Sequence, residues 1–120
     1  MAINIEQLRQ LINVYKPIGI VSGREFLLHP DDALRLADDL GKIGIRLVGA
    51  DGWYYANREL NYLVEDPGIG CSVSDDFSES VEETIALVRN FITTKLPEHI
   101  EFVALTPDFP FDQYRLLYMP

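Results

Sequence analysis

The side chains of this chain that could carry out chemistry are one cysteine, two histidines and a surplus of carboxylates. Cys71 lies in a run of glycine and serine between acidic pairs, and negative charge disfavours the thiolate, which is the nucleophilic form. His29 and His99 combine with Cys71 in none of the spacings typical of a zinc site. We therefore predict no catalytic residue, no metal site and no cofactor, and the sequence favours a protein that is not an enzyme.

Glycine-rich and acidic stretches match no phosphate or calcium motif. Gly68-Ile69-Gly70 begins a G-x-G pattern, but its sixth position is Val73 and no Lys-Ser/Thr follows, so a phosphate loop is not predicted. Counting from Asp66, the third and fifth positions of an EF-hand loop are glycines, which offer no side-chain oxygen. The glycine stretch is therefore interpreted as a turn, and the acids that follow it as residues at a helix N-terminus.

The whole chain has a net charge of −9, and this negative charge is concentrated in its second half. Residues 61–120 carry three Lys or Arg and eleven Asp or Glu. Seven acidic residues and no basic residue lie within 65–88, namely Glu65, Asp66, Asp75, Asp76, Glu79, Glu82 and Glu83. Such a field repels nucleic-acid backbones and attracts basic proteins. Solubility and the preference of acids for helix starts explain the same charges without a partner.

Aromatic residues adjoin this acidic segment. Trp53, Tyr54 and Tyr55 are consecutive, so on a strand Trp53 and Tyr55 face one side and Tyr54 faces the other. Tryptophan and tyrosine anchor many protein interfaces, although they also dominate cores. We predict that these three aromatics and the seven acids form a partner-binding surface.

Three helices are predicted by apolar residues recurring at three- and four-residue spacing, over 4–15, 30–42 and 79–96. Pro30 suits a first helical position, and Ser80 with Glu83 has the spacing of a capping box. Both helices therefore begin at recognisable signals. Residues 18–21 have a strand-like composition, and 26–28 fit either a strand or a buried connector.

Alternating residues predict further strands. Strands over 45–50 and 53–56 are predicted to form a hairpin around Asp51-Gly52, because this pair suits a two-residue turn. A third strand over 60–64 is expected to end at Asp66-Pro67-Gly68. Residues 99–105 and 114–119 complete the set, the last being a strand or, alternatively, a helical turn.

These elements predict one α+β domain over 1–120. Its antiparallel or mixed sheet has four to six strands, with three helices mainly on one face. The single cysteine and the absence of a membrane-length apolar run or a signal peptide favour a soluble, cytoplasmic protein.

The function predicted from charge is a non-enzymatic acidic module that binds a basic protein, as an inhibitor, immunity-like protein or adaptor does. One alternative is a homo-oligomer that pairs through an edge strand or the C-terminal aromatics. Another is a small-molecule binder or small enzyme with a pocket between helix 79–96 and the sheet, where Arg24, Arg46 or Tyr55 orients an anion. Neither nucleic acid nor a membrane is an expected partner.

Overall fold

The computed structural model describes residues 5–73 and 80–119. Its helices are α1 (Ile5–Tyr15), the 3-10 helix η1 (Lys16–Ile18), α2 (Pro30–Lys42), α3 (Val81–Thr94) and α4 (Phe111–Arg115). Its strands are β1 (Ile20–Ser22), β2 (Glu25–Leu28), β3 (Leu47–Asn57), β4 (Tyr62–Ser72) and β5 (Phe102–Pro107).

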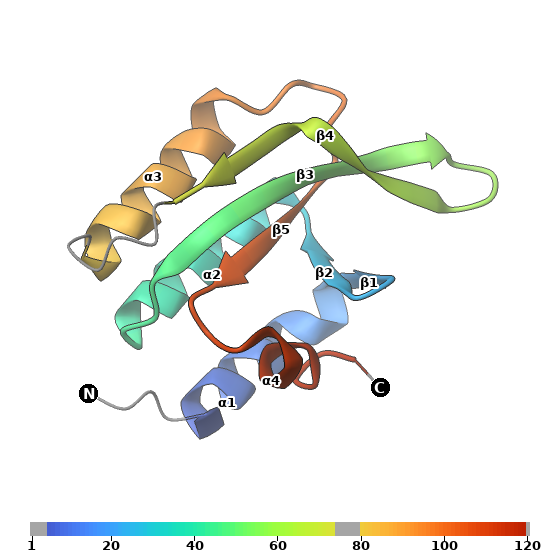
Figure 1. Ribbon diagram of the computed structural model, residues 1–120. Coiled ribbons are helices and arrows are strands. Elements are labelled where there is room, and N and C mark those ends of the chain that lie inside the picture. The colour runs from blue at the N-terminus through green and yellow to red at the C-terminus, as the bar shows by residue number, and fades with distance from the viewer. Residues whose placement is uncertain (1–4, 74–79, 120) are drawn as a thin grey trace.

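The five strands form one antiparallel sheet in the order β1-β2-β5-β3-β4. Apolar residues of α1, α2 and α3 share one buried core with one face of the sheet, and α2 passes behind β3 and β5 in Figure 1. The predicted α+β fold, its sheet size and its three long helices are therefore confirmed. No helix within the described ranges has both the length and the apolar character needed to cross a bilayer.

Local signals fix where the helices begin. Pro30 is the first residue of α2, and Nδ1 of His29 accepts a hydrogen bond from the Asp31 N–H at 3.4 Å. Ser80 caps α3 by accepting a hydrogen bond from the Glu83 N–H at 3.1 Å. These contacts satisfy N–H groups that have no partner inside the helix.

The predicted turn at Asp51-Gly52 is wrong, because β3 continues straight through it. Both residues pair with β5 on one side, and neither has the positive φ that a two-residue hairpin turn requires. A Cβ atom at Gly52 would lie 3.0 Å from Cγ2 of Ile69 and 3.1 Å from Cγ2 of Ile100. The glycine therefore serves close packing inside the sheet rather than a reversal of the chain.

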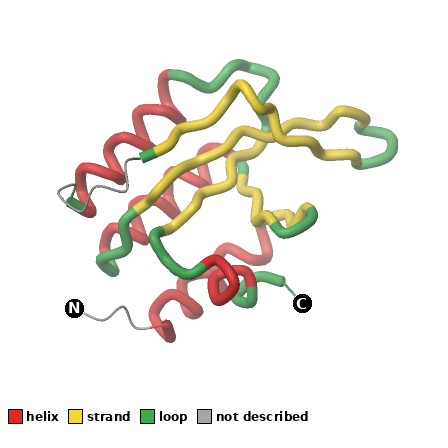
Figure 2. Tube along the Cα trace, in the orientation of Figure 1, coloured by secondary structure: helices red, strands yellow, loops and turns green. Residues whose placement is uncertain are grey.

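The hairpin turn lies further along, between Asn57 and Tyr62. Oδ1 of Asn57 accepts a hydrogen bond from the Leu60 N–H at 3.2 Å, and Asn61 has a φ of 53°. The predicted three-strand meander is thus a single hairpin of two 11-residue strands. Its far end, residues 54–65, projects beyond the other strands and is called the arm below (Figure 2).

Asp66-Pro67-Gly68 does not end a strand as predicted but bulges out of β4. Glu65 pairs with Trp53, and Gly70 pairs with Asp51. Residues 66–69 of β4 therefore lie opposite a single residue of β3, Gly52. Oδ1 of Asp66 accepts a hydrogen bond from the Gly68 N–H at 3.0 Å. The expected turn chemistry is present, but it bends the strand instead of reversing the chain.

The strand expected over 114–119 is wrong, because α4 ends at Arg115 and residues 116–118 follow it as hydrogen-bonded turns. Tyr114, Leu117 and Tyr118 recur at helical spacing and are all buried. The Tyr118 ring stacks on Phe26 with a centroid distance of 5.2 Å, and its hydroxyl donates to the Arg24 carbonyl at 2.7 Å. A helical turn therefore covers this end of the sheet, which agrees with the alternative prediction for residues 114–119.

Candidate partner-binding surface

Three carboxylates from three strands lie on the sheet face that is turned away from the core. Leu28 and Val103 are paired and belong to the core, so alternation directs Glu25 to the opposite face. The same alternation along β3 and its pairing with β4 place Asp51 and Glu65 there. This second face, called the open face below, is toward the viewer in Figure 1.

The three carboxylates repel one another in partly desolvated positions. The side chains of Asp51 and Glu65 lie close enough for each to influence the pKa of the other. Burial raises the pKa of Asp51, and burial followed by repulsion from Asp51 raises the pKa of Glu65. Burial first, then the charges of Asp51 and Glu65, raises the pKa of Glu25. A cation at this place would relieve the repulsion that opposes ionisation.

Aromatic rings lie on the same face, beside Glu65. Trp53 is directly paired with both Glu65 and Phe102, and its indole Nε1 is buried with no hydrogen-bond partner among the described residues. The Tyr55 ring meets Phe102 edge to face with a centroid distance of 5.6 Å, and the Arg58 guanidinium lies 5.1 Å from the Tyr55 centroid. The open face thus combines negative charge with large, half-buried rings, and such rings are enriched in protein interfaces.

Tyr54 and Asp66 make contacts elsewhere. The Tyr54 ring packs edge to face on His99 with a centroid distance of 5.4 Å, and Nε2 of His99 lies 2.8 Å from Oδ2 of Asp66. The hydrogen bond with His99, and then the one from the Gly68 N–H, lowers the pKa of Asp66. Asp66 is therefore engaged by its own chain, whereas Trp53 and Glu65 lie together on the open face.

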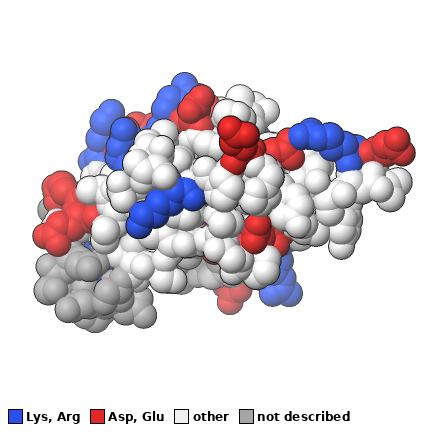
Figure 3. Space-filling view, turned by 90° about the horizontal axis from the view of Figure 1, so that it is seen from above, with Lys and Arg blue, Asp and Glu red and all other residues white. Residues whose placement is uncertain are grey.

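The predicted acidic surface is divided in space. Glu82 and Glu83 occupy the first turn of α3, where the helix dipole favours them. Asp75, Asp76 and Glu79 lie outside the described residues. Seen from above, Lys and Arg side chains lie among the Asp and Glu side chains, so the described part of this side has mixed charge (Figure 3). The charge pattern alone does not define a single patch.

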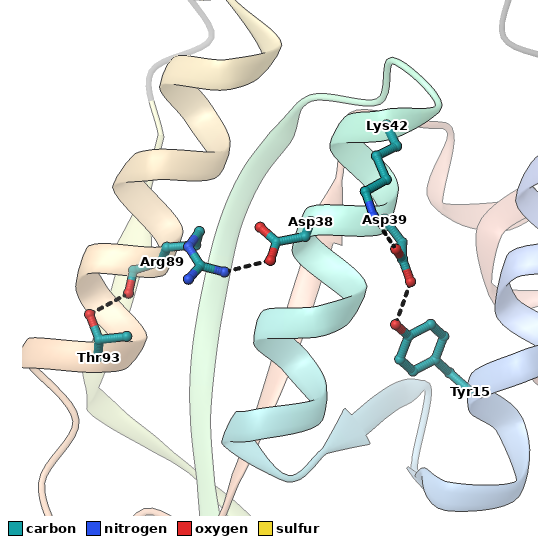
Figure 4. Close-up of polar contacts among 6 residues, drawn as sticks. All are labelled: Tyr15, Asp38, Asp39, Lys42, Arg89 and Thr93. Carbon is teal, nitrogen blue, oxygen red and sulfur yellow. Dashed lines mark hydrogen bonds and ion pairs between the residues drawn. The ribbon is translucent and has the colours of Figure 1, made fainter.

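A groove of about 330 Å³ runs between α2 and α3. Nη1 of Arg89 lies 2.7 Å from Oδ2 of Asp38 across it, so these two charges already compensate each other (Figure 4). On the other side of α2, the Tyr15 hydroxyl donates to Oδ2 of Asp39 at 2.6 Å and ties α1 to α2 (Figure 4). These polar contacts join the three helices.

The three residues considered for an anion pocket lie in separate places. Arg24 is in the β1–β2 turn, Arg46 precedes β3 and lies 3.4 Å from Oδ2 of Asp108, and Tyr55 is on the arm. A different cavity, of about 120 Å³, lies beside α4 and is lined partly by Glu25 and Tyr114. Nothing in this arrangement brings the two arginines and Tyr55 to one ligand.

Glu25 and Asp51 belong to the open face, but the sequence pattern did not predict them as partner-binding residues. Each is a lone acid beside apolar residues in a strand, which was the available signal.

Among the described residues, no three His, Cys, Asp or Glu side chains are arranged to hold a metal ion. Burial raises the pKa of Cys71, so its thiolate is disfavoured at neutral pH.

Comparison of the chain with protein-family models, with curated proteins and with solved structures finds no match. The open face and its contacts are therefore the basis for a functional assignment.

Proposed function

We propose that this chain is a protein-binding module that recognises a basic segment of a partner protein through the open face. The observation that carries the proposal is the placement of Glu25, Asp51 and Glu65, from three different strands, on one sheet face, where Trp53 is paired with Glu65. An inhibitor, an immunity-like protein or an adaptor would use such a surface in the same way.

Charge complementarity supports a basic partner. The chain carries a net charge of −9, which raises the encounter rate with a positively charged protein. At the surface itself, a lysine or arginine side chain between Asp51 and Glu65 would replace carboxylate repulsion by attraction. Trp53 and Tyr55 would supply the apolar contact area that charge alone lacks.

A basic peptide can test the proposal directly. The probe is a ten-residue, end-blocked peptide in which lysine alternates with threonine. Trp53 is the only tryptophan of the chain, so its fluorescence reports binding at the open face. We expect the double variant Asp51→Asn, Glu65→Gln to bind the peptide at least about tenfold more weakly at physiological salt, because it removes both charges that face the lysine.

The matched control is the double variant Glu82→Gln, Glu83→Gln. It changes the net charge by the same amount, but α3 lies on the other side of the sheet. Screening over roughly 8 Å at physiological ionic strength should keep its effect below about twofold. Equal losses in the two double variants would mean that only net charge matters and would refute the proposal, as would an absence of binding by the unaltered chain.

A further inference from the structure

Among residues 5–73 and 80–119, no strand pairs with the outer edge of β4 along the arm, and this edge is called free below. β4 is the last strand of the sheet, and its bulge at 66–69 separates residues 62–65 from the rest of the strand. In Figure 1 this part of the hairpin extends past β1, β2 and β5. An exposed strand edge presents unpaired backbone groups to which another strand can pair.

Hydrogen bonds on β3 show which residues of β4 point outward. The Glu101 N–H donates to the Trp53 carbonyl at 2.9 Å, so the backbone groups of Trp53 point toward β5. In antiparallel strands this direction alternates with each residue, so Tyr54 points toward β4, where its partner is Val64. The N–H and C=O groups of the residues flanking Val64 on β4 must therefore point away from β3.

The two edges of the arm differ. On the β3 edge, the Tyr55 N–H donates to Oε2 of Glu101 at 3.1 Å, and Arg58 forms an ion pair with the same carboxylate. The chain therefore closes this edge with its own side chains. On the β4 edge, Leu63 and Glu65 direct their backbone groups outward, and their side chains lie on the open face with Trp53 and Tyr55.

We propose that the basic segment binds in an extended conformation antiparallel to Leu63–Glu65 and adds a strand to the free edge of β4, with a lysine or arginine beside Glu65. This inference rests on the proposed function and specifies how the partner binds. Side chains directly opposite each other on neighbouring strands lie about 5 Å apart, so the incoming cation would reach Glu65, which lies on the same face as Asp51 of the neighbouring strand.

A second copy of the chain fits this edge poorly. The segment 59–88 contains no Lys or Arg, while β4 itself carries Glu65 and Asp66. Pairing of β4 with β4 of another copy would bring like charges together, which is unfavourable between neighbouring strands. Charge complementarity therefore selects a basic segment of a different protein.

The experiment leaves the protein unchanged and modifies the lysine–threonine peptide. In an antiparallel added strand whose lysines lie on the open face opposite Leu63 and Glu65, the lysine N–H groups point toward β4 and the threonine N–H groups point away. Methylation of the lysine backbone nitrogens should therefore weaken binding by roughly tenfold or more, since it removes the edge hydrogen bonds. Methylation of the threonine backbone nitrogens is the matched control and should leave the affinity nearly unchanged.

Hydrogen exchange gives a second readout. In the free protein the Leu63 and Glu65 amide hydrogens should exchange faster than that of Val64, and the unmodified peptide should slow both. Equal affinities of the two methylated peptides, or unchanged exchange at Leu63 and Glu65, would overturn strand addition. The proposed function would survive that result if the Asp51→Asn, Glu65→Gln variant still bound every peptide more weakly than its control; absence of all binding would overturn both.

Discussion

The hydroxyl of Thr84 joins α3 to the first residue of β3, and its removal should destabilise the protein. Thr84 is fully buried. Its Oγ1 donates to the Val81 carbonyl at 2.9 Å and accepts a hydrogen bond from the Leu47 N–H at 3.1 Å. The substitution Thr84→Val keeps the shape of the side chain but leaves the buried Leu47 N–H without this acceptor.

The expected magnitude follows from that orphaned donor. A buried backbone N–H that loses its partner costs about 1–3 kcal/mol. Threonine and valine have similar helix propensities, so the cost arises from the hydrogen bond rather than from the helix. With an unfolding entropy of about 2.1 cal/mol/K per residue, a loss of about 2 kcal/mol lowers the Tm by about 8 °C for a chain of this length.

Thr84→Ser is the matched control, because it keeps the oxygen and loses only a methyl group. Its cost should be about 1 kcal/mol, from lost burial and a small cavity. Urea unfolding followed by circular dichroism, together with thermal melts, measures both variants. If Thr84→Val proved as stable as the unaltered chain, or more stable than Thr84→Ser, the methyl group would matter more than the hydrogen bond and the reasoning would be refuted.

Two further predictions concern the pairing of β3 with β4. Because the pKa of Glu65 is raised in the folded protein, folding takes up a proton, and the free energy of unfolding should fall as pH rises from the unfolded-state pKa through the folded one. In urea titrations between about pH 4 and pH 8, Glu65→Gln should reduce this dependence of the unfolding free energy on pH. If the variant and the unaltered chain showed the same dependence, it would not arise at Glu65 and Asp51. A Cβ at Gly49 would lie 2.8 Å from the Cys71 carbonyl oxygen, so Gly49→Ala should cost about 1–3 kcal/mol. Gly68→Ala, whose Cβ meets only ordinary contacts, should lie within about 0.5 kcal/mol of the unaltered chain, and similar urea midpoints for both variants would contradict this explanation.

Part of the candidate surface could be predicted from the sequence. Trp53 and Glu65 were both expected to bind a partner, and the register pairs them directly. Glu25 and Asp51 were not expected, because the face on which a strand residue lies depends on pairing with strands that are distant in sequence. Asp51-Gly52 was also predicted to be a turn, whereas Asp51 lies within a continuous strand.

The sequence by itself determined the three long helices and the fold class. Helical hydrogen bonds join residues four apart, so apolar periodicity, Pro30 and the Ser80 cap contain nearly all the information needed to locate α2 and α3. Only the tertiary structure decided the strands, because their hydrogen-bond partners are remote. β3 continues through Gly52 because it pairs with β5 there. Four residues of β4 lie opposite this single glycine, so the predicted end of a strand is a bulge instead. The same long-range pairing brings acids from β2, β3 and β4 onto one face, which no local pattern specifies.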